Sequence, residues 1–108
     1  MHQTTFSADF ERTGGDTVVR VRGELDLTTA PALRAALEAA LQECIEPDSM
    51  SVEVDMFEVT FIDCSGLNAL IACRREAASP GPTLSLVRPS WCVRRVVGLT
   101  NTAMLLAA

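Results

Sequence analysis

The chain has 108 residues, enough for one compact domain and too few for two. Its nine basic residues, all arginine, and fourteen acidic residues give a net charge of −5, which argues against binding to nucleic acid or an anionic membrane. A hydrophobic fraction of 48% with 21% charged residues is typical of globular proteins, so we predict a single folded domain over residues 1–108.

Two strands are predicted at the start of the chain. A weaker one covers residues 5–11, and a second covers residues 17–22, where Val19 and Val21 alternate with arginines. The adjacent glycines between them, Gly14 and Gly15, suit a hairpin turn. We therefore expect one antiparallel strand pair at an edge of the sheet.

A helix is predicted next, over residues 29–44. Thr28 or Thr29 can cap it, and Pro31 suits its first turn. Its apolar stripe consists of Leu33, Leu37, Leu41 and Cys44, continued by Ile45.

Strands and helices alternate through the rest of the chain. The pattern predicts strands at residues 51–56 and 83–87, and helices at residues 65–78 and 90–98. This order implies parallel crossovers and hence an α/β sheet. Because the strands alternate instead of being apolar throughout, the helices are expected mainly on one face.

The cysteines and the ends of the chain exclude several classes of protein. Four widely spaced cysteines with no Cys-x-x-Cys pair, and the single histidine His2, do not predict a metal site, and no cofactor motif is present. No apolar stretch could span a membrane, and the first residues lack a signal peptide pattern. We expect a cytoplasmic protein with free thiols.

The connection between the third strand and the second helix, residues 59–68, carries the candidate site. Asp63 and Ser65 are good helix caps and Gly66 allows a tight turn, so the simplest interpretation is a helix start. Cys64 lies where unpaired N–H groups and the helix dipole favour an anion such as a phosphate or a thiolate.

Three stretches together point to a known family. Residues 61–67 read Phe-Ile-Asp-Cys-Ser-Gly-Leu; residues 23–26 read Gly-Glu-Leu-Asp and are followed by Thr-Thr-Ala at 28–30; residues 93–99 are a looser match. They resemble the STAS domains (sulfate transporter and anti-sigma factor antagonist), whose loop usually reads Asp-Ser-Ser-Gly-Leu after an aromatic and an apolar residue. The resemblance spans nearly the whole chain and implies a STAS-like α/β fold with a mixed sheet of four to five strands.

The resemblance also implies a function. Stand-alone bacterial members of this family are antagonists: the unphosphorylated domain binds an anti-sigma factor, often a serine kinase, and frees a sigma factor for transcription. Phosphorylation of the first loop Ser places about −1.5 to −2 charges in that interface and abolishes binding. The chain is thus expected to be a non-enzymatic interaction module. The implied partner-binding residues are Asp26, Asp63, Cys64, Ser65, Gly66, Leu67 and Asn68.

The chain departs from the family at the phospho-acceptor position, which is Cys64. Three outcomes are open: antagonism that is insensitive to phosphorylation, a redox switch at Cys64, or phosphate transfer to Ser65 instead. We place Ser65 last because its hydroxyl is expected to cap the helix. Cys73 lies on the same helix roughly 13 Å away, too far for a disulfide with Cys64.

Other interpretations remain. The chain could be the small STAS subunit that docks on the ATPase of a membrane lipid-transport complex, or a thiol enzyme, although no histidine lies near Cys64 in the sequence to activate it. Trp91 and Cys92 are expected to serve packing. The Arg74-Arg75 and Arg94-Arg95 pairs are expected to be exposed, and each is too small for a nucleic-acid site.

A second departure concerns the last residues. The family usually adds a short strand and a further helix after Gly98 and Leu99, whereas here only residues 100–108 follow, of which residues 103–108 suit the strand alone. We therefore expect exposed apolar surface and a possible homodimer.

Overall fold

The computed structural model describes residues 6–13, 16–42, 51–77 and 83–102. Four strands and three helices follow in the order ββαβαβα. The strands are β1 (Phe6–Thr13), β2 (Asp16–Leu25), β3 (Ser51–Ile62) and β4 (Thr83–Val87). The helices are α1 (Ala30–Gln42), α2 (Cys64–Glu76) and α3 (Trp91–Leu99).

The strands form one mixed sheet in the order β1-β2-β3-β4. β1 pairs antiparallel with β2, whereas β2–β3 and β3–β4 are parallel, so the predicted antiparallel edge is confirmed. Thr13 pairs with Asp16 across the predicted hairpin, whose two glycines lie outside the described residues. The predicted helix residues Cys44 and Ile45 and the predicted last strand also lie outside them. The second helix ends at Glu76, two residues before its predicted end at 78, and Ala77 is its C-cap.

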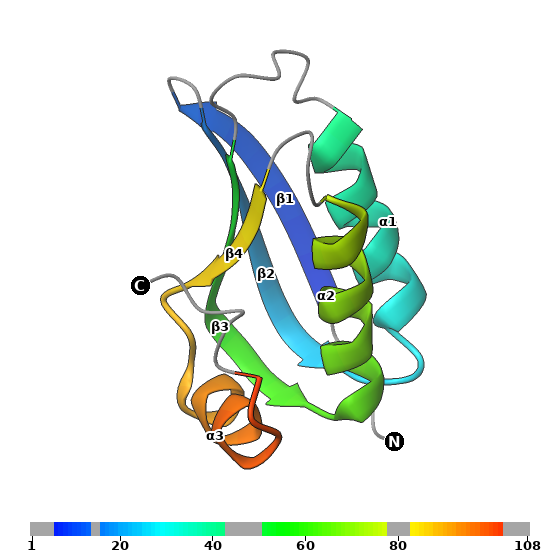
Figure 1. Cartoon of the computed structure of the whole chain (residues 1–108), viewed down its shortest axis with the longest axis vertical. Helices are drawn as coiled ribbons and strands as arrows, with labels where there is room; N and C mark the ends of the chain where they lie inside the picture. The colour runs from blue at the N-terminus through cyan, green and yellow to red at the C-terminus, as the bar shows by residue number, and fades with distance from the viewer. Residues whose placement is uncertain (1–5, 14–15, 43–50, 78–82, 103–108) are drawn as a thin grey trace.

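Helices α1 and α2 lie side by side on one face of the sheet, and α3 lies beside the last part of β3, apart from them (Figure 1). The apolar residues of the alternating strands face α1 and α2 and are buried with the leucines of those helices. Among them Val19, Leu33, Leu37 and Leu70 are fully buried. The predicted stripe and alternation therefore describe the core, as expected when one face of each strand is covered.

Both central strands are longer than predicted because β-bulges interrupt their alternation. The register between β2 and β3 shifts between Arg20 and Arg22 and again after Gly23, which has a φ of 97°. Only glycine adopts this conformation without strain. At the first shift Asp55 and Met56 are both buried, whereas the next two residues of β3 are both exposed. A two-residue period cannot be followed through such a position.

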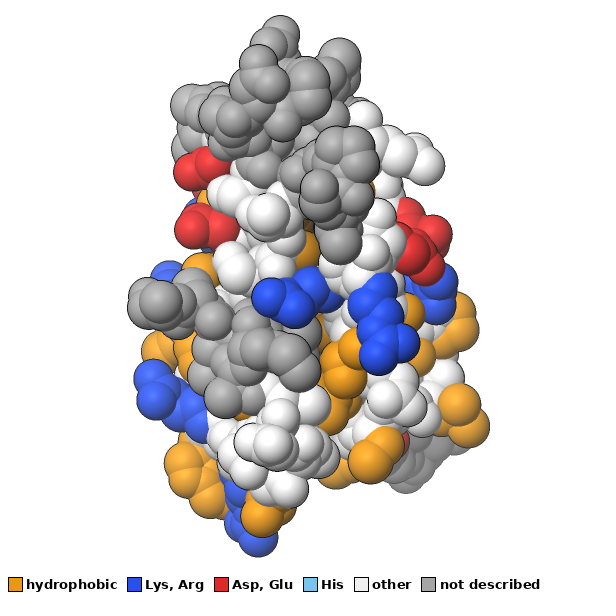
Figure 2. Space-filling view, viewed as in Figure 1, with side chains coloured by type: hydrophobic (Ala, Val, Ile, Leu, Met, Phe, Trp, Pro, Cys, Tyr) orange, Lys and Arg blue, Asp and Glu red, His pale blue; other side chains and the backbone are white. Residues whose placement is uncertain are grey.

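Apolar and basic side chains are exposed together around α3. Figure 2 shows hydrophobic and arginine side chains next to each other at the lower end, where α3 lies. Trp91 is 71% exposed, so the prediction that it serves packing is wrong. Cys92 is half-buried and packs against the core, as predicted, and its Sγ donates a hydrogen bond to the carbonyl oxygen of Val59 at 3.3 Å.

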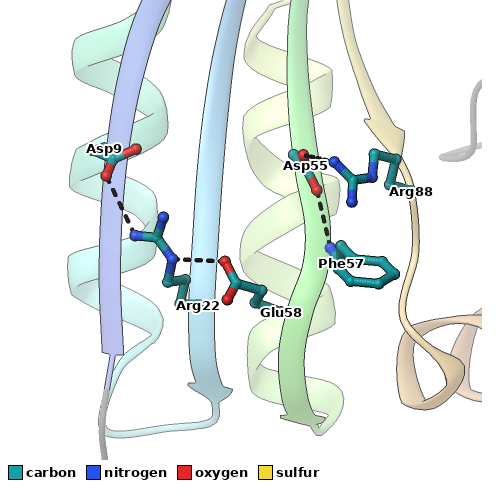
Figure 3. Close-up of polar contacts among 6 residues, drawn as sticks. All are labelled: Asp9, Arg22, Asp55, Phe57, Glu58 and Arg88. Atoms are coloured by element: carbon teal, nitrogen blue, oxygen red, sulfur yellow. Dashed lines mark hydrogen bonds and ion pairs between the residues drawn. The ribbon is translucent and has the colours of Figure 1, made fainter.

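The sheet face opposite α1 and α2 carries paired charges (Figure 3). Arg22 bridges Glu58 at 2.7 Å and Asp9 at 3.4 Å. The buried carboxylate of Asp55 accepts the backbone N–H of Phe57 at 3.0 Å and pairs with Arg88 at 3.3 Å. The charges of this face largely neutralise one another, and the exposed ring of Phe57 lies among them with the Arg88 guanidinium 4.6 Å from its centre.

In the part of the chain that the structure describes, no helix is long and apolar enough to cross a membrane.

Candidate functional site

Two loops meet at the carboxyl ends of β2 and β3. Leu25 and Ile62 are register partners in this parallel pair, so the residues that follow each strand emerge at the same edge of the sheet. The N–H of Asp63 donates to the carbonyl oxygen of Leu25 at 3.1 Å and ties the loops together. The predicted residues Asp26 and 63–68, which are distant in the sequence, therefore share one end of the fold.

Asp63 fixes the start of α2. Its Oδ1 accepts the backbone N–H of Ser65 at 2.8 Å and that of Gly66 at 3.1 Å. It has extended backbone angles and serves as the helix N-cap. The two bonds satisfy donors that the first turn of a helix leaves unpaired, and the carboxylate faces the positive end of the helix dipole.

Replacing Asp63 with alanine is expected to lower the free energy of unfolding by about 1 kcal/mol, because both cap hydrogen bonds are lost. Chemical denaturation measures the change. Asp63→Asn is the matched control, since an asparagine side chain caps helices equally well, and it should unfold close to the wild type. Equal losses in the two variants would show that the charge, and not the cap, stabilises the loop.

Asp26 plays a similar part in the neighbouring loop. Its Oδ1 accepts the N–H of Thr28 at 2.9 Å and that of Thr29 at 3.1 Å. The Thr29 hydroxyl donates to the carbonyl oxygen of Glu24 at 2.7 Å and accepts the N–H of Asp26 at 2.9 Å. The prediction that a threonine caps α1 is thus incomplete, because Asp26 holds the turn that leads into the helix.

The loop residues 64–68 divide into exposed and buried members. Cys64 and Asn68 are exposed and Ser65 is half-buried, whereas Gly66 and Leu67 are buried. Since Asp63 supplies the cap, the expectation that the Ser65 hydroxyl caps α2 is wrong. Gly66 and Leu67 therefore pack beneath the loop and are not exposed for contact with a partner.

A groove of about 440 Å³ runs beside this loop, between α1 and α2. It is lined by Leu27, Ala30, Pro31, Arg34, Ser65, Asn68, Ala69 and Ala72. Most of the lining is apolar, and an ion pair between Arg34 and Glu76 joins the two helices. Leu27 is 76% exposed at the groove. An exposed leucine beside a mostly apolar groove is typical of a surface that contacts another protein.

The described cysteines differ in their surroundings. Cys64 is an exposed free thiol at the first position of α2, and Cys73 is a buried free thiol on the same helix. Burial raises the pKa of Cys73 from an ordinary 9.0 to about 11, Glu76 and Glu38 add to the rise, and Arg34 opposes it. Cys64 is therefore the cysteine of α2 that is placed for chemistry at the surface.

At pH 8 a thiol-alkylating reagent is expected to label Cys64 and leave Cys73 unmodified in the folded protein, because Cys73 is both inaccessible and protonated. Peptide mass spectrometry reports each site.

The raised pKa of Cys73 favours folding while the thiol stays neutral, so stability is fully present below pH 9 and falls as the pH rises towards 11. Labelling of Cys73 at a rate equal to that of Cys64 would contradict its burial.

No group of three or more His, Cys, Asp or Glu side chains suited to a metal ion occurs among the described residues. The site therefore consists of an exposed loop with a thiol, a hydroxyl and an amide, next to an apolar groove. Such an arrangement suits binding to a protein surface. Sequence reasoning missed Leu27, whose only local signal is an apolar residue between two capping residues.

Comparisons with known proteins identify the family and the fold. The family model described as "Mlab, STAS domain" matches residues 8–107. No curated protein sequence matches the chain. An anti-sigma factor antagonist from Mycobacterium paratuberculosis is 27% identical, with a TM-score of 0.80 over 94% of this chain and 83% of that one.

The anti-sigma factor antagonist SpoIIAA has a similar fold at 23% identity in two solved forms. The unphosphorylated form has a TM-score of 0.70 over 94% of this chain and 86% of that one. The phosphorylated form, described as a Bacillus cell fate determinant, has a TM-score of 0.65 over 94% of this chain and 89% of that one. The mixed sheet with three helices thus matches the fold of anti-sigma factor antagonists.

Proposed function

Because the chain belongs to the STAS domain family, we propose that it is an anti-sigma factor antagonist, which binds an anti-sigma factor and so releases a sigma factor. The observation that carries the proposal is the exposed loop of Cys64, Ser65 and Asn68 beside the groove between α1 and α2. The groove takes an apolar side chain of the partner, and the loop supplies polar contacts around it. No catalytic step is required of this chain.

The cysteine at position 64 changes how the antagonist is regulated. A serine kinase transfers phosphate to a hydroxyl, and Cys64 has none, so the interface does not acquire the added charge that breaks it. We infer that binding is insensitive to phosphorylation. The competing outcomes are oxidation of the exposed Cys64 thiol and phosphorylation of Ser65, whose hydroxyl is not used as the helix cap.

One experiment separates these outcomes. The wild type, Cys64→Ser and Cys64→Ala are each mixed with an anti-sigma factor of the same organism and ATP; binding is measured by calorimetry and phosphate is mapped by mass spectrometry. We expect all three to bind, and only Cys64→Ser to be phosphorylated and released. Phosphate on Ser65 of the wild type would overturn the inference on regulation. Absence of binding to every anti-sigma factor tested would overturn the function itself.

Oxidation is tested on the same proteins. If Cys64 is a redox switch, peroxide lowers the affinity of the wild type for the anti-sigma factor and leaves that of Cys64→Ala unchanged. Equal losses in the two proteins would place the sensitive thiol elsewhere.

The matching family description, which begins with Mlab, leaves a second candidate: a small STAS subunit that docks on the ATPase of a lipid-transport complex. The same loop and groove would then face the ATPase. Co-purification with transporter components from membranes, without an anti-sigma factor, decides for this candidate.

A further inference from the structure

We propose that a second surface, the outer face of α3 formed by Trp91, Arg94, Arg95 and Leu99, binds an acidic and partly apolar segment of another protein. α3 lies beside β3 and apart from α1 and α2 (Figure 1). The groove of the proposed antagonist site is lined by residues in and next to α1 and α2, and none of its lining residues belongs to α3. The α3 outer face can therefore bind a segment whichever partner occupies the loop of Cys64.

The two sides of α3 differ sharply in burial. Val93 and Val97 are buried against the core, while Trp91 is 71% and Leu99 is 77% exposed. A methyl group added at Gly98 would meet nothing within 4 Å, so the exposed side is open. Large apolar side chains that remain this exposed on a short helix are characteristic of interaction surfaces, and tryptophan is among the residues that contribute most to binding.

The charges of the α3 outer face are not neutralised within the described part of the chain. Arg94 reaches only the carbonyl oxygen of Pro89, at 3.4 Å, and Arg95 lies over the Trp91 ring at 5.3 Å. Neither makes an ion pair there, and α3 contains no acidic residue. By contrast, the described residues include arginines elsewhere that are paired with carboxylates, namely Arg20, Arg22, Arg34 and Arg88.

The arginines of α2 stabilise the end of their helix, whereas those of α3 do not. Arg74 and Arg75 lie in the last turn of α2, where positive charge stabilises the end of the helix dipole. Arg94 and Arg95 lie in the middle of α3, and its last turn has no basic residue. In a chain with a net charge of −5, this local positive surface complements carboxylates of a partner.

The Trp91–Arg95 contact also holds the surface ready for binding. A cation over an aromatic ring restricts both side chains, so less conformational entropy is lost when a partner docks. The exposed Leu99 lies near the other end of the helix, about one turn beyond Arg95, and adds an apolar contact. The matching partner segment carries carboxylates for the arginines and an apolar side chain for Trp91 and Leu99.

A protein segment fits this surface better than a nucleic acid or a membrane does. Two arginines neutralise too few phosphates for useful affinity to a nucleic acid. An extended anionic bilayer would also meet the acidic remainder of the chain, whereas a narrow acidic segment meets α3 alone.

Trp91 is the only tryptophan of the chain and reports on this surface directly. The full chain is titrated with an amphipathic helical peptide of Glu, Leu and Ala, and with the same peptide carrying Lys in place of Glu. We expect the acidic peptide alone to shift Trp91 emission to shorter wavelength, with an affinity that falls as salt is added. No shift with the acidic peptide, or equal shifts with both peptides, would overturn the proposal.

Matched variants locate the interaction. The double substitution Arg94→Glu and Arg95→Glu should weaken binding of the acidic peptide by roughly tenfold or more. Arg74→Glu with Arg75→Glu makes the same change in net charge on α2 and should weaken binding much less. Equal losses would show attraction to overall charge and refute a site on α3, as would a blue shift with phosphatidylglycerol vesicles in place of the acidic peptide.

Discussion

Replacing Leu67 with aspartate is expected to destabilise the domain by more than about 4 kcal/mol, enough to unfold most of it under ordinary conditions. Leu67 is only 3% exposed and belongs to the single core cluster beneath the loop. A carboxylate there loses its hydration among apolar side chains. Since small domains are stable by only about 5–15 kcal/mol, this one substitution removes much of the margin.

The neighbouring residue is the matched control for this substitution. Asn68→Asp introduces the same charge one position along α2 at an exposed site and should change the free energy of unfolding by no more than about 0.5 kcal/mol. Circular dichroism during urea unfolding measures both variants. A folded Leu67→Asp protein would contradict the burial of this side chain. Loss of partner binding in Leu67→Asp therefore reports on the fold, and Asn68→Asp is the variant that reports on the interface.

Substituting alanine for Gly66 is expected to lower the free energy of unfolding by about 2 kcal/mol, with a fall in Tm of about 10 °C. A Cβ at this position would lie 2.6 Å from the carbonyl oxygen of Leu25 and 2.8 Å from its Cβ. The nearest atom belongs to the backbone of β2, which cannot rotate away. The clash outweighs the gain of about 1 kcal/mol that alanine brings to a helix.

Gly98→Ala provides the opposite control, because its added methyl group meets no atom within 4 Å on α3. It should leave stability unchanged or raise it by about 0.5–1 kcal/mol. Thermal unfolding of both variants tests the pair. If Gly66→Ala were as stable as the wild type, the close approach of α2 to Leu25 would not be required for the fold.

Most of the secondary structure could be predicted because its signals are local. Val19 and Val21 alternate with arginines, and the leucines of α1 repeat at helical spacing, so each pattern identifies its own element. The predicted strands ended too early, at residue 22 in β2 and at residue 56 in β3, whereas the strands end at Leu25 and Ile62. Bulges near Gly23 and Asp55 break the alternation there, and they arise from the pairing of two strands that are distant in the sequence.

The candidate site was predicted less completely than the fold. Asp63 and Gly66 have local roles, a helix cap and a close backbone approach, and residue type indicates both. Burial of Leu67 and exposure of Leu27 depend on what packs against the loops. The Ser65 cap was predicted wrongly because Asp63 and Ser65 are both good capping residues and lie only two positions apart. The N-cap precedes the first helical residue, and since α2 begins at Cys64, the cap is Asp63.

The sequence by itself determined the order of strands and helices and the α/β class, because these follow from residue types and their spacing. The resemblance to STAS domains singled out the thiol of Cys64, because their loops usually carry a serine at that position. Only the tertiary structure decided which residues of the loop face outward, how Asp26 holds its turn, and that Trp91 lies on the surface beside arginines that form no ion pair with any described residue. The physical reason is that burial and charge pairing depend on neighbours supplied by other elements, which no local pattern encodes.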